Sequence, residues 1–208
     1  MRRFTYLAVV AAMTGLLAGS AATAASAATS QPADSRTAAV HLRGGTTTVT
    51  TAPGVASALL GAGIVPLATW PGRESVLSAG SGTAVRFTFP VTGGRVTLSP
   101  LGGQIEHSGG ILFLNLKNGK DVEVSQFTID LTHAVLTGIV NGNRSARVPL
   151  FRLVLSHAVL VAGRHVVTAR GIGLTLTAIA AKALNAALGT KLFHAGLNLG
   201  TAGTLLRF

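Results

Sequence analysis

One histidine in this sequence lies in a stretch whose spacing suits ligand binding. His107 stands between two glycine pairs, Gly102-Gly103 and Gly109-Gly110. Glycine lets the backbone turn sharply and adds no side chain beside a neighbouring ring, so we predict an accessible imidazole here. Imidazole is a common ligand for metal centres. A histidine in a glycine-rich turn can equally be exposed or bonded to the backbone without binding a ligand, and both interpretations of His107 stay open.

The acidic residues give little support for catalysis. The chain has six of them, and no H-E-x-x-H or G-x-S-x-G pattern accompanies them, since Gly80-Ser81-Gly82 lacks the required spacing. Asp121, Glu123 and Asp130 lie on or beside one predicted strand, where carboxylates usually form a solvated edge. We therefore predict no enzyme activity, no catalytic residues and no metal site. Hydrolysis is the alternative that would contradict this prediction most directly.

The composition argues against several other classes of protein. The chain has no cysteine, which rules out disulfides and thiolate metal sites, so burial of apolar side chains must hold the fold. The net charge is +11. The basic residues are dispersed, and few aromatic side chains are present for base stacking, which argues against nucleic-acid binding. An anionic cell-wall polymer stays open as a partner.

The N-terminal residues have the order of a secretory signal peptide. A basic pair, Arg2-Arg3, precedes an apolar segment at residues 7–18, and Ala25-Ser26-Ala27 fits the A-x-A cleavage pattern. We predict a signal peptide at residues 1–27. The rest of the chain is then expected to be secreted, either extracellular or associated with the cell wall.

The residues after the cleavage point divide into two parts. Residues 28–43 are mostly polar or small and show no periodicity, so we predict a flexible tether. Residues 44–208 are predicted to form a single β-rich domain. The later apolar run at residues 174–188 is interrupted by Lys182, so no transmembrane segment is expected after signal cleavage.

Two Asn-Gly dipeptides organise the centre of the predicted domain. Asn118-Gly119 lies between β-prone runs and readily supplies the two consecutive positive φ angles of a type I′ turn, and Asn141-Gly142 begins a second turn that residues 143–146 extend as a loop. Both dipeptides therefore predict turns between antiparallel strands. The strands that these turns and a short intervening loop join are predicted at residues 111–117, 120–131, 134–140 and 147–155.

Other local patterns complete the predicted fold. In one of these strands the apolar side chains change phase, which predicts a β-bulge near Ser125-Gln126, because a period of two cannot change phase without an extra residue. Thr92-Gly93-Gly94 predicts another hairpin turn. Apolar residues at helical spacing predict short helices at about residues 55–62 and at 177–188, the second ended by Gly189. We predict a mainly β fold: an antiparallel β-sandwich or open barrel with two short helices.

Several segments, taken in order, resemble the HtaA-type domain of actinobacterial haem-uptake proteins. The resemblance extends from Phe87 to about Thr201. It is carried by Phe89-Pro90-Val91-Thr92-Gly93-Gly94, the run Gly-x-Ile-x-His-x-Gly-Gly around His107, Leu136-Thr137, Leu174-Thr175-Leu176-Thr177-Ala178 and Ala195-Gly196-Leu197. The resemblance implies a β-rich domain with a small helical element.

The same resemblance implies a haem site, and the sequence departs from it at one residue. The family binds haem through an axial tyrosine, assisted by a histidine in the glycine-flanked motif, and His107 matches that histidine. The tyrosine has no counterpart, because the chain's one tyrosine is Tyr6 in the predicted signal peptide. We therefore expect a secreted, non-catalytic binding or cell-surface module that has kept the scaffold without the haem-ligating tyrosine. Haem binding through His107 and binding of an anionic cell-wall polymer remain as alternatives.

Overall fold

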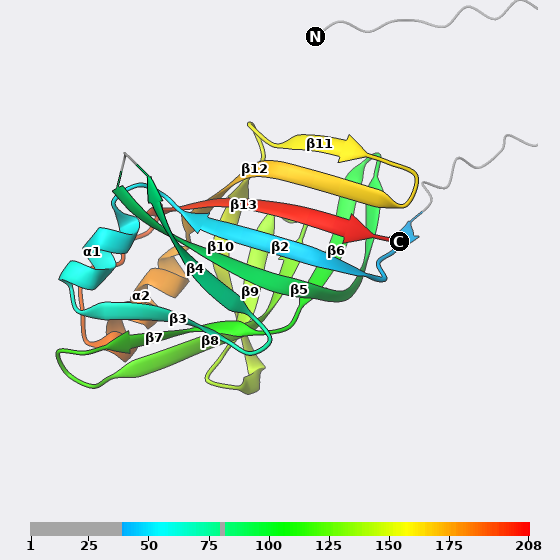
Figure 1. The fold of residues 1–208 in the computed structure, drawn as a ribbon. Helices are drawn as coiled ribbons and strands as arrows, with labels where there is room; N and C mark the ends of the chain where they lie inside the picture. The colour runs from blue at the N-terminus through cyan, green and yellow to red at the C-terminus, as the bar shows by residue number, and fades with distance from the viewer. Residues whose placement is uncertain (1–38, 80–81) are drawn as a thin grey trace, which may run out of the picture. The chain divides into compact units, whose positions relative to one another are not determined.

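Strands account for most of the chain that the computed structural model describes, which comprises residues 39–79 and 82–208 (Figure 1). The first strands are β1 (Val40–His41), β2 (Gly44–Thr51), β3 (Ile64–Thr69), β4 (Arg73–Ala79), β5 (Gly82–Leu98), β6 (Leu101–His107) and β7 (Gly110–Asn115). The later strands are β8 (Asp121–Asp130), β9 (Val135–Val140), β10 (Asn143–Val154), β11 (Val159–Ala162), β12 (Val166–Leu176) and β13 (Asn198–Arg207). The helices are α1 (Val55–Gly61) and α2 (Ala178–Leu188).

Eight of these strands form a closed antiparallel barrel in the order β5-β2-β13-β12-β10-β9-β8-β6. The circle closes because β6 pairs with β5 along one edge and with β8 along the other. Alternate side chains of the barrel strands point inward, among them Phe87, Ile105 and Leu174, which are all buried. The predicted antiparallel β fold with two short helices is confirmed.

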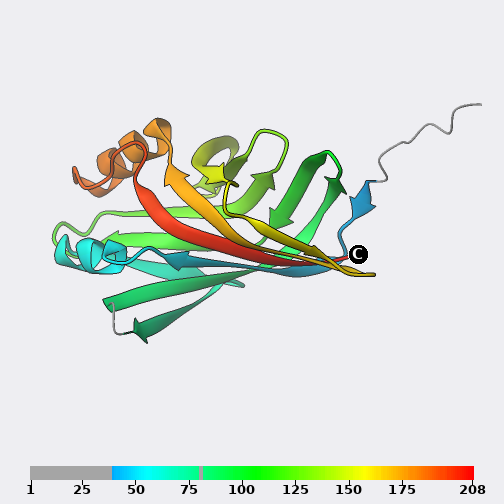
Figure 2. The ribbon, with the colours of Figure 1, turned by 90° about the horizontal axis from the view of Figure 1, so that it is seen from above.

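The barrel is closed by β6 over only part of its length. Beyond the end of β6, the first half of β5 pairs with β4 instead. The first half of β8 pairs with β7, and β7 pairs with β3. Among the described strands, β3 and β4 share no ladder of hydrogen bonds with each other. The wall is therefore interrupted between β3 and β4, and Figures 1 and 2 show both helices at this end.

Helix α2 is held at both termini by contacts that its sequence explains. The Thr177 side chain caps the N-terminus by accepting a hydrogen bond from the backbone N–H of Ala180 at 3.1 Å, and Gly189 ends the helix with φ of 63°. At the C-terminus, the amides of Asn115 and Asn118 donate to the Leu188 carbonyl at 2.9 and 3.0 Å. The predicted helix and its end at Gly189 are confirmed, and the helix begins at Ala178, one residue later than predicted.

The predicted turns and bulge are mostly confirmed. Asn141-Gly142 has positive φ at both residues, and the bulge in β8 lies at Gln126, whose φ is 49°. The β7–β8 hairpin is present, but only Gly119 has a positive φ, so the type I′ prediction is wrong there. The turn predicted at Thr92-Gly93-Gly94 is also wrong, because β5 continues through these residues with a register shift against β6.

The ordered domain begins earlier than predicted. Residues 1–38, which include the predicted signal peptide and most of the predicted tether, lie outside the described residues. Within the predicted tether, however, β1 pairs Val40 with Val96 and His41 with Arg95, and Leu42 is buried in the core. The prediction that residues 40–42 are flexible is therefore wrong. In the described part of the chain, no helix is both long and apolar enough to cross a bilayer.

We expect Gly103→Ala to destabilise the domain strongly, because the barrel closes here by direct contact between backbones. Gly103 has φ of 94°, and a Cβ at this position would lie 2.0 Å from the carbonyl oxygen of Arg95 on β5. We expect a loss of about 3 kcal/mol of unfolding free energy, from backbone strain and steric overlap together. Urea denaturation followed by circular dichroism measures it.

The matched control is Gly119→Ala, which has a similar positive φ of 69° but no neighbouring atom within 4 Å of the added Cβ. This variant should lose only about 1 kcal/mol from the left-handed backbone conformation. Equal losses for the two variants would show that the close approach of β5 and β6 does not limit stability.

Candidate functional site: the barrel interior around His107

His107, the one candidate ligand-binding residue predicted from the sequence, lies inside the barrel. It is the last residue of β6, and only 5% of its surface is exposed. Its Nε2 lies 2.7 Å from Oγ1 of Thr47 on β2, and its Nδ1 lies 3.2 Å from the carbonyl oxygen of Phe127 on β8. The prediction of an accessible imidazole is therefore wrong, since both ring nitrogens are already hydrogen-bonded within the protein.

The surroundings keep this imidazole neutral. Burial lowers the pKa of His107 from its ordinary value of 6.5 to about 4, an effect only partly opposed by hydrogen bonds to the carbonyls of Phe127 and Ile105. The Phe127 carbonyl oxygen can only accept a hydrogen bond, so Nδ1 of the neutral ring carries the proton. Nε2 then accepts a hydrogen bond from the Thr47 hydroxyl. The Thr47 hydroxyl in turn lies 2.9 Å from Oγ1 of Thr204 on β13. A short chain of polar groups thus crosses an otherwise apolar interior.

The glycines after His107 have a different role from the one predicted. A Cβ at Gly109, where φ is 85°, would lie 2.6 Å from the backbone nitrogen of Gly72, and a Cβ at Gly110 would lie 2.6 Å from the Val124 carbonyl oxygen on β8. The β3–β4 turn therefore occupies the space beside Gly109, and β8 occupies the space beside Gly110. The turn is fixed by a 2.9 Å hydrogen bond from Thr69 Oγ1 to Glu123. These glycines make room for the protein's own chain.

The barrel interior contains a cavity of about 80 Å³ next to His107. Six of the chain's eight phenylalanines line it: Phe87, Phe89, Phe113, Phe127, Phe151 and Phe193. Two pairs of these rings meet edge-on, Phe89–Phe127 with centroids 5.0 Å apart and Phe113–Phe193 with centroids 6.4 Å apart. His107, Thr47 and Thr51 also line the cavity, but their polar atoms are not exposed to it. The wall of the site is thus apolar and largely aromatic.

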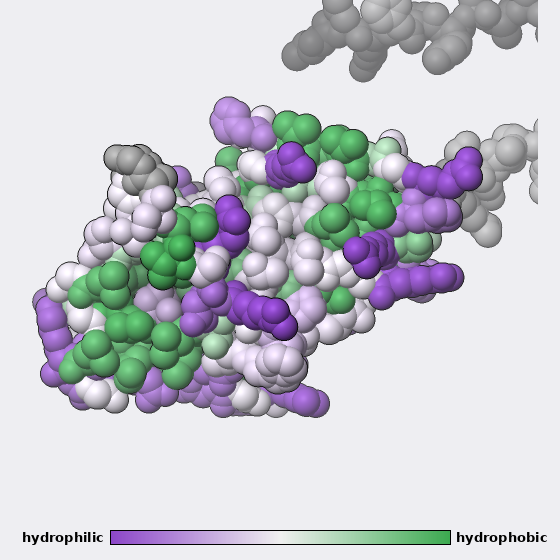
Figure 3. Space-filling model, viewed as in Figure 1, coloured by the Kyte–Doolittle hydropathy of each residue, from purple (hydrophilic) through white to green (hydrophobic). Residues whose placement is uncertain are grey.

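The interrupted part of the barrel wall borders this cavity. Pro66 on β3 and Leu59 on α1 line it, and both elements lie at the end where β3 and β4 separate. Large apolar side chains at this end are exposed, namely those of Leu60, Leu67, Val76 and Leu116. Figure 3 shows an apolar surface over α1 and β3. An apolar molecule approaching the cavity from this side would meet an apolar surface first.

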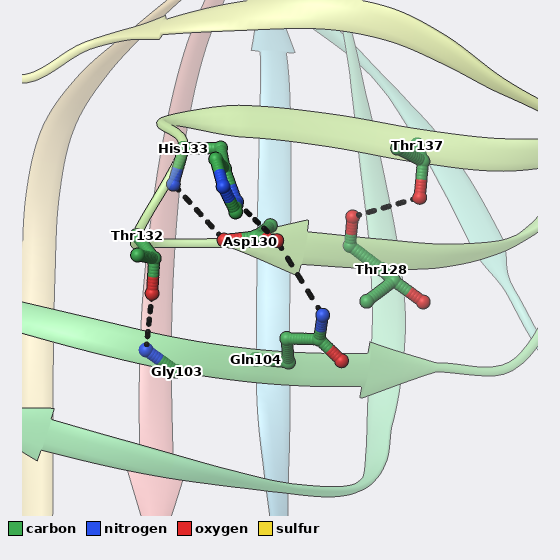
Figure 4. A network of polar contacts seen from close by, with 7 residues as sticks. All are labelled: Gly103, Gln104, Thr128, Asp130, Thr132, His133 and Thr137. Atoms are coloured by element: carbon green, nitrogen blue, oxygen red, sulfur yellow. Dashed lines mark hydrogen bonds and ion pairs between the residues drawn. The ribbon is translucent and has the colours of Figure 1, made fainter.

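The acidic residues considered in the sequence lie away from this interior. Asp130 accepts hydrogen bonds from His133, whose Nδ1 is 2.9 Å away, and from Gln104, and it braces the turn between β8 and β9 (Figure 4). Partial burial raises the pKa of Asp130, but the hydrogen bonds from His133 and Gln104 outweigh it, so the pKa lies below its usual value. The described residues contain no group of three side chains placed to hold a metal ion.

We expect the folded protein to lose stability as the pH falls from about 6.5 to about 4, because the unfolded imidazole of His107 takes up a proton in this range and the folded one does not. The loss from this group should reach about 3 kcal/mol of unfolding free energy. Glutamine does not titrate in this pH range, so the unfolding free energy of His107→Gln should change less steeply with pH. Urea denaturation of both proteins at several pH values measures the difference, and parallel profiles would contradict the assignment.

The fold is similar to that of solved structures, although comparison of the sequence finds no match. No protein-family model and no curated protein matches the chain. The structure is similar to the crystal structure of the C-terminal domain of HtaA from Corynebacterium glutamicum, with 13% sequence identity, 79% of this chain and 98% of that chain covered, and a TM-score of 0.53. A domain-swapped dimer of a variant of the same domain also matches, with 15% identity, 73% and 89% coverage and a TM-score of 0.49. The distant resemblance to the HtaA-type domain is confirmed at the level of the fold.

Proposed function

We propose that this chain is a non-catalytic binding module that holds a small apolar molecule inside the barrel, beside His107. The observation that carries the proposal is the apolar cavity lined by six phenylalanines. Pockets that bind small molecules are lined predominantly by apolar and aromatic side chains.

The chemistry of the lining restricts the ligand. Aromatic walls favour a flat or compact apolar body, and the apolar lining offers no partner to a charged group. At about 80 Å³ the cavity is smaller than the engineered cavity of about 150 Å³ that is known to hold benzene. Binding therefore requires the barrel wall to widen. Between β3 and β4 this would break no ladder of backbone hydrogen bonds, because these two strands are not paired.

Haem, which the family resemblance implied, does not fit the residues that are present. Both nitrogens of His107 are engaged, and the chain has no tyrosine beyond Tyr6. Pockets for ligands of drug size or larger usually measure about 300–1,000 Å³, several times this cavity. We propose that the chain has kept the HtaA-type scaffold without a haem-iron site.

Export and the absence of catalysis belong to the same proposal. Support for export comes from the predicted signal peptide at residues 1–27, and sequencing the N-terminus of protein recovered from culture medium tests it. Support for a non-catalytic role comes from the lining of the cavity, which contributes no carboxylate. An anionic cell-wall polymer would bind on the outer surface and does not account for the aromatic interior.

We expect the neutral fluorophore 1-aminoanthracene to bind the protein with increased emission, because it matches the apolar, aromatic lining once the wall between β3 and β4 widens to admit it. Val49→Phe, which places a larger side chain in the cavity lining, should weaken this binding about ten-fold, or about 1.4 kcal/mol. Fluorescence titration measures the affinity.

The control is Val135→Phe on β9, a residue that is half-buried and does not line the cavity. This variant should bind as the unaltered protein does. Equal loss of binding in both variants, or binding that is unchanged by Val49→Phe, would remove the cavity from the proposed function.

We expect haemin to show no histidine-dependent Soret band with this protein, because His107 is buried and hydrogen-bonded. His107→Ala and His41→Ala should then give the same absorbance titration. If haemin binds at least about ten-fold more weakly to His107→Ala than to His41→Ala, His107 ligates haem and the proposal is wrong on this point.

A further inference from the structure

Strand β11 carries apolar side chains that the fold leaves uncovered. Val159, Leu160 and Val161 are 60%, 44% and 60% exposed, and all four residues of the strand are exposed. Single exposed apolar residues are normal on a protein surface, whereas a continuous exposed run marks an interaction site. Figure 3 shows this apolar surface over β11, with hydrophilic side chains beside it.

Basic side chains share the face of the two valines. Arg170 on β12 is the register partner of Val159, and Arg207 on β13 is the register partner of Val166, so each pair points to the same side of the sheet. Arg164 lies in the turn between β11 and β12 and is exposed. The apolar strand is therefore bordered by guanidinium groups.

No opposite charge neutralises this part of the chain. Residues 131–208 contain no aspartate or glutamate. Their lysines and arginines are Arg144, Arg147, Arg152, Arg164, Arg170, Lys182, Lys191 and Arg207. The surface formed by β11 and its neighbours thus combines exposed apolar side chains with positive charge that has no acidic partner within this segment.

We propose that β11, with Arg164, Arg170 and Arg207, binds the surface of an anionic lipid bilayer. The valines enter the boundary between headgroups and acyl chains, and the arginines bind lipid phosphates. A soluble polyanion would satisfy the arginines but leave the valines in water. A second copy of the chain would bring the same three arginines into proximity, and like charges would oppose the contact. This surface is independent of the interior cavity.

The test is co-sedimentation of the protein with phospholipid vesicles. The protein should bind vesicles that contain phosphatidylcholine and phosphatidylglycerol in about equal parts, and it should bind pure phosphatidylcholine far more weakly. Salt should weaken the binding, because the attraction to anionic lipid is screened. The double variant Val159→Ser/Val161→Ser should bind at least about ten-fold more weakly. Arg170→Gln should bind about five-fold more weakly.

The controls remove a similar group elsewhere on the surface. Leu116→Ser removes an equally exposed apolar side chain on the β7–β8 hairpin, and Lys182→Gln removes a charge from the exposed side of α2. Both should bind as the unaltered protein does, and thermal unfolding confirms that all variants are folded. Since the changed residues are exposed, loss of binding is not expected to reflect loss of the fold.

Several results would overturn the proposal. Equal binding to both kinds of vesicle, or to neither, would exclude recognition of anionic lipid. Binding to soluble polyphosphate that matches binding to vesicles and is unchanged in Val159→Ser/Val161→Ser would assign the surface to polyanions instead. A concentration-dependent dimer in gel filtration that the same double variant abolishes would make β11 an interface between copies of this chain.

Discussion

The close approach of the backbones of β5 and β6 is the contact on which the barrel depends. Gly94 and Gly103 face the carbonyls of the opposite strand at distances that no side chain would allow. This contact places β6 where it also reaches β8, and no other described strand joins those two edges. Because β6 ends at His107, the closed part of the barrel ends there as well. The wall is continued beyond that point by β4 and β7–β3, whose β3 and β4 edges share no ladder of hydrogen bonds.

Local signals in the sequence predicted those features whose causes are local. The Gly189 cap of α2, the Asn141-Gly142 turn and the bulge at Gln126 each depend on a few neighbouring residues, and the structure confirms them. Gly93-Gly94 was ambiguous for the same reason, because two glycines permit a turn or a bulge equally. Only the partner strand, which pairs Gly93 with Glu106, distinguishes the two.

The candidate site was less predictable, because its contacts join distant segments. The burial of His107 could have been inferred, since it shares a strand face with Ile105, an apolar residue two positions earlier. The glycines around it suggested open space instead. Its partner Thr47 stands 60 residues away and has no sequence signal of its own. The β3–β4 turn that fills the space beside Gly109 is also distant in the sequence and carries no signal of this contact. The glycine-flanked motif that suggested a ligand site is therefore a packing site for the protein's own backbone.

The asparagines that cap α2 have a mechanical consequence for the interior. Asn115 and Asn118 tie the last carbonyl of α2 to the β7–β8 hairpin, and Asn185 exchanges two hydrogen bonds with the backbone of Phe193. Helix α1 has no side-chain cap at its N-terminus, but at its C-terminus Lys117 Nζ of the same hairpin donates to the Gly61 carbonyl at 3.1 Å. The C-terminal carbonyls of both helices are therefore held by one hairpin. A displacement of the β7–β8 hairpin would thus move the ends of α1 and α2 together.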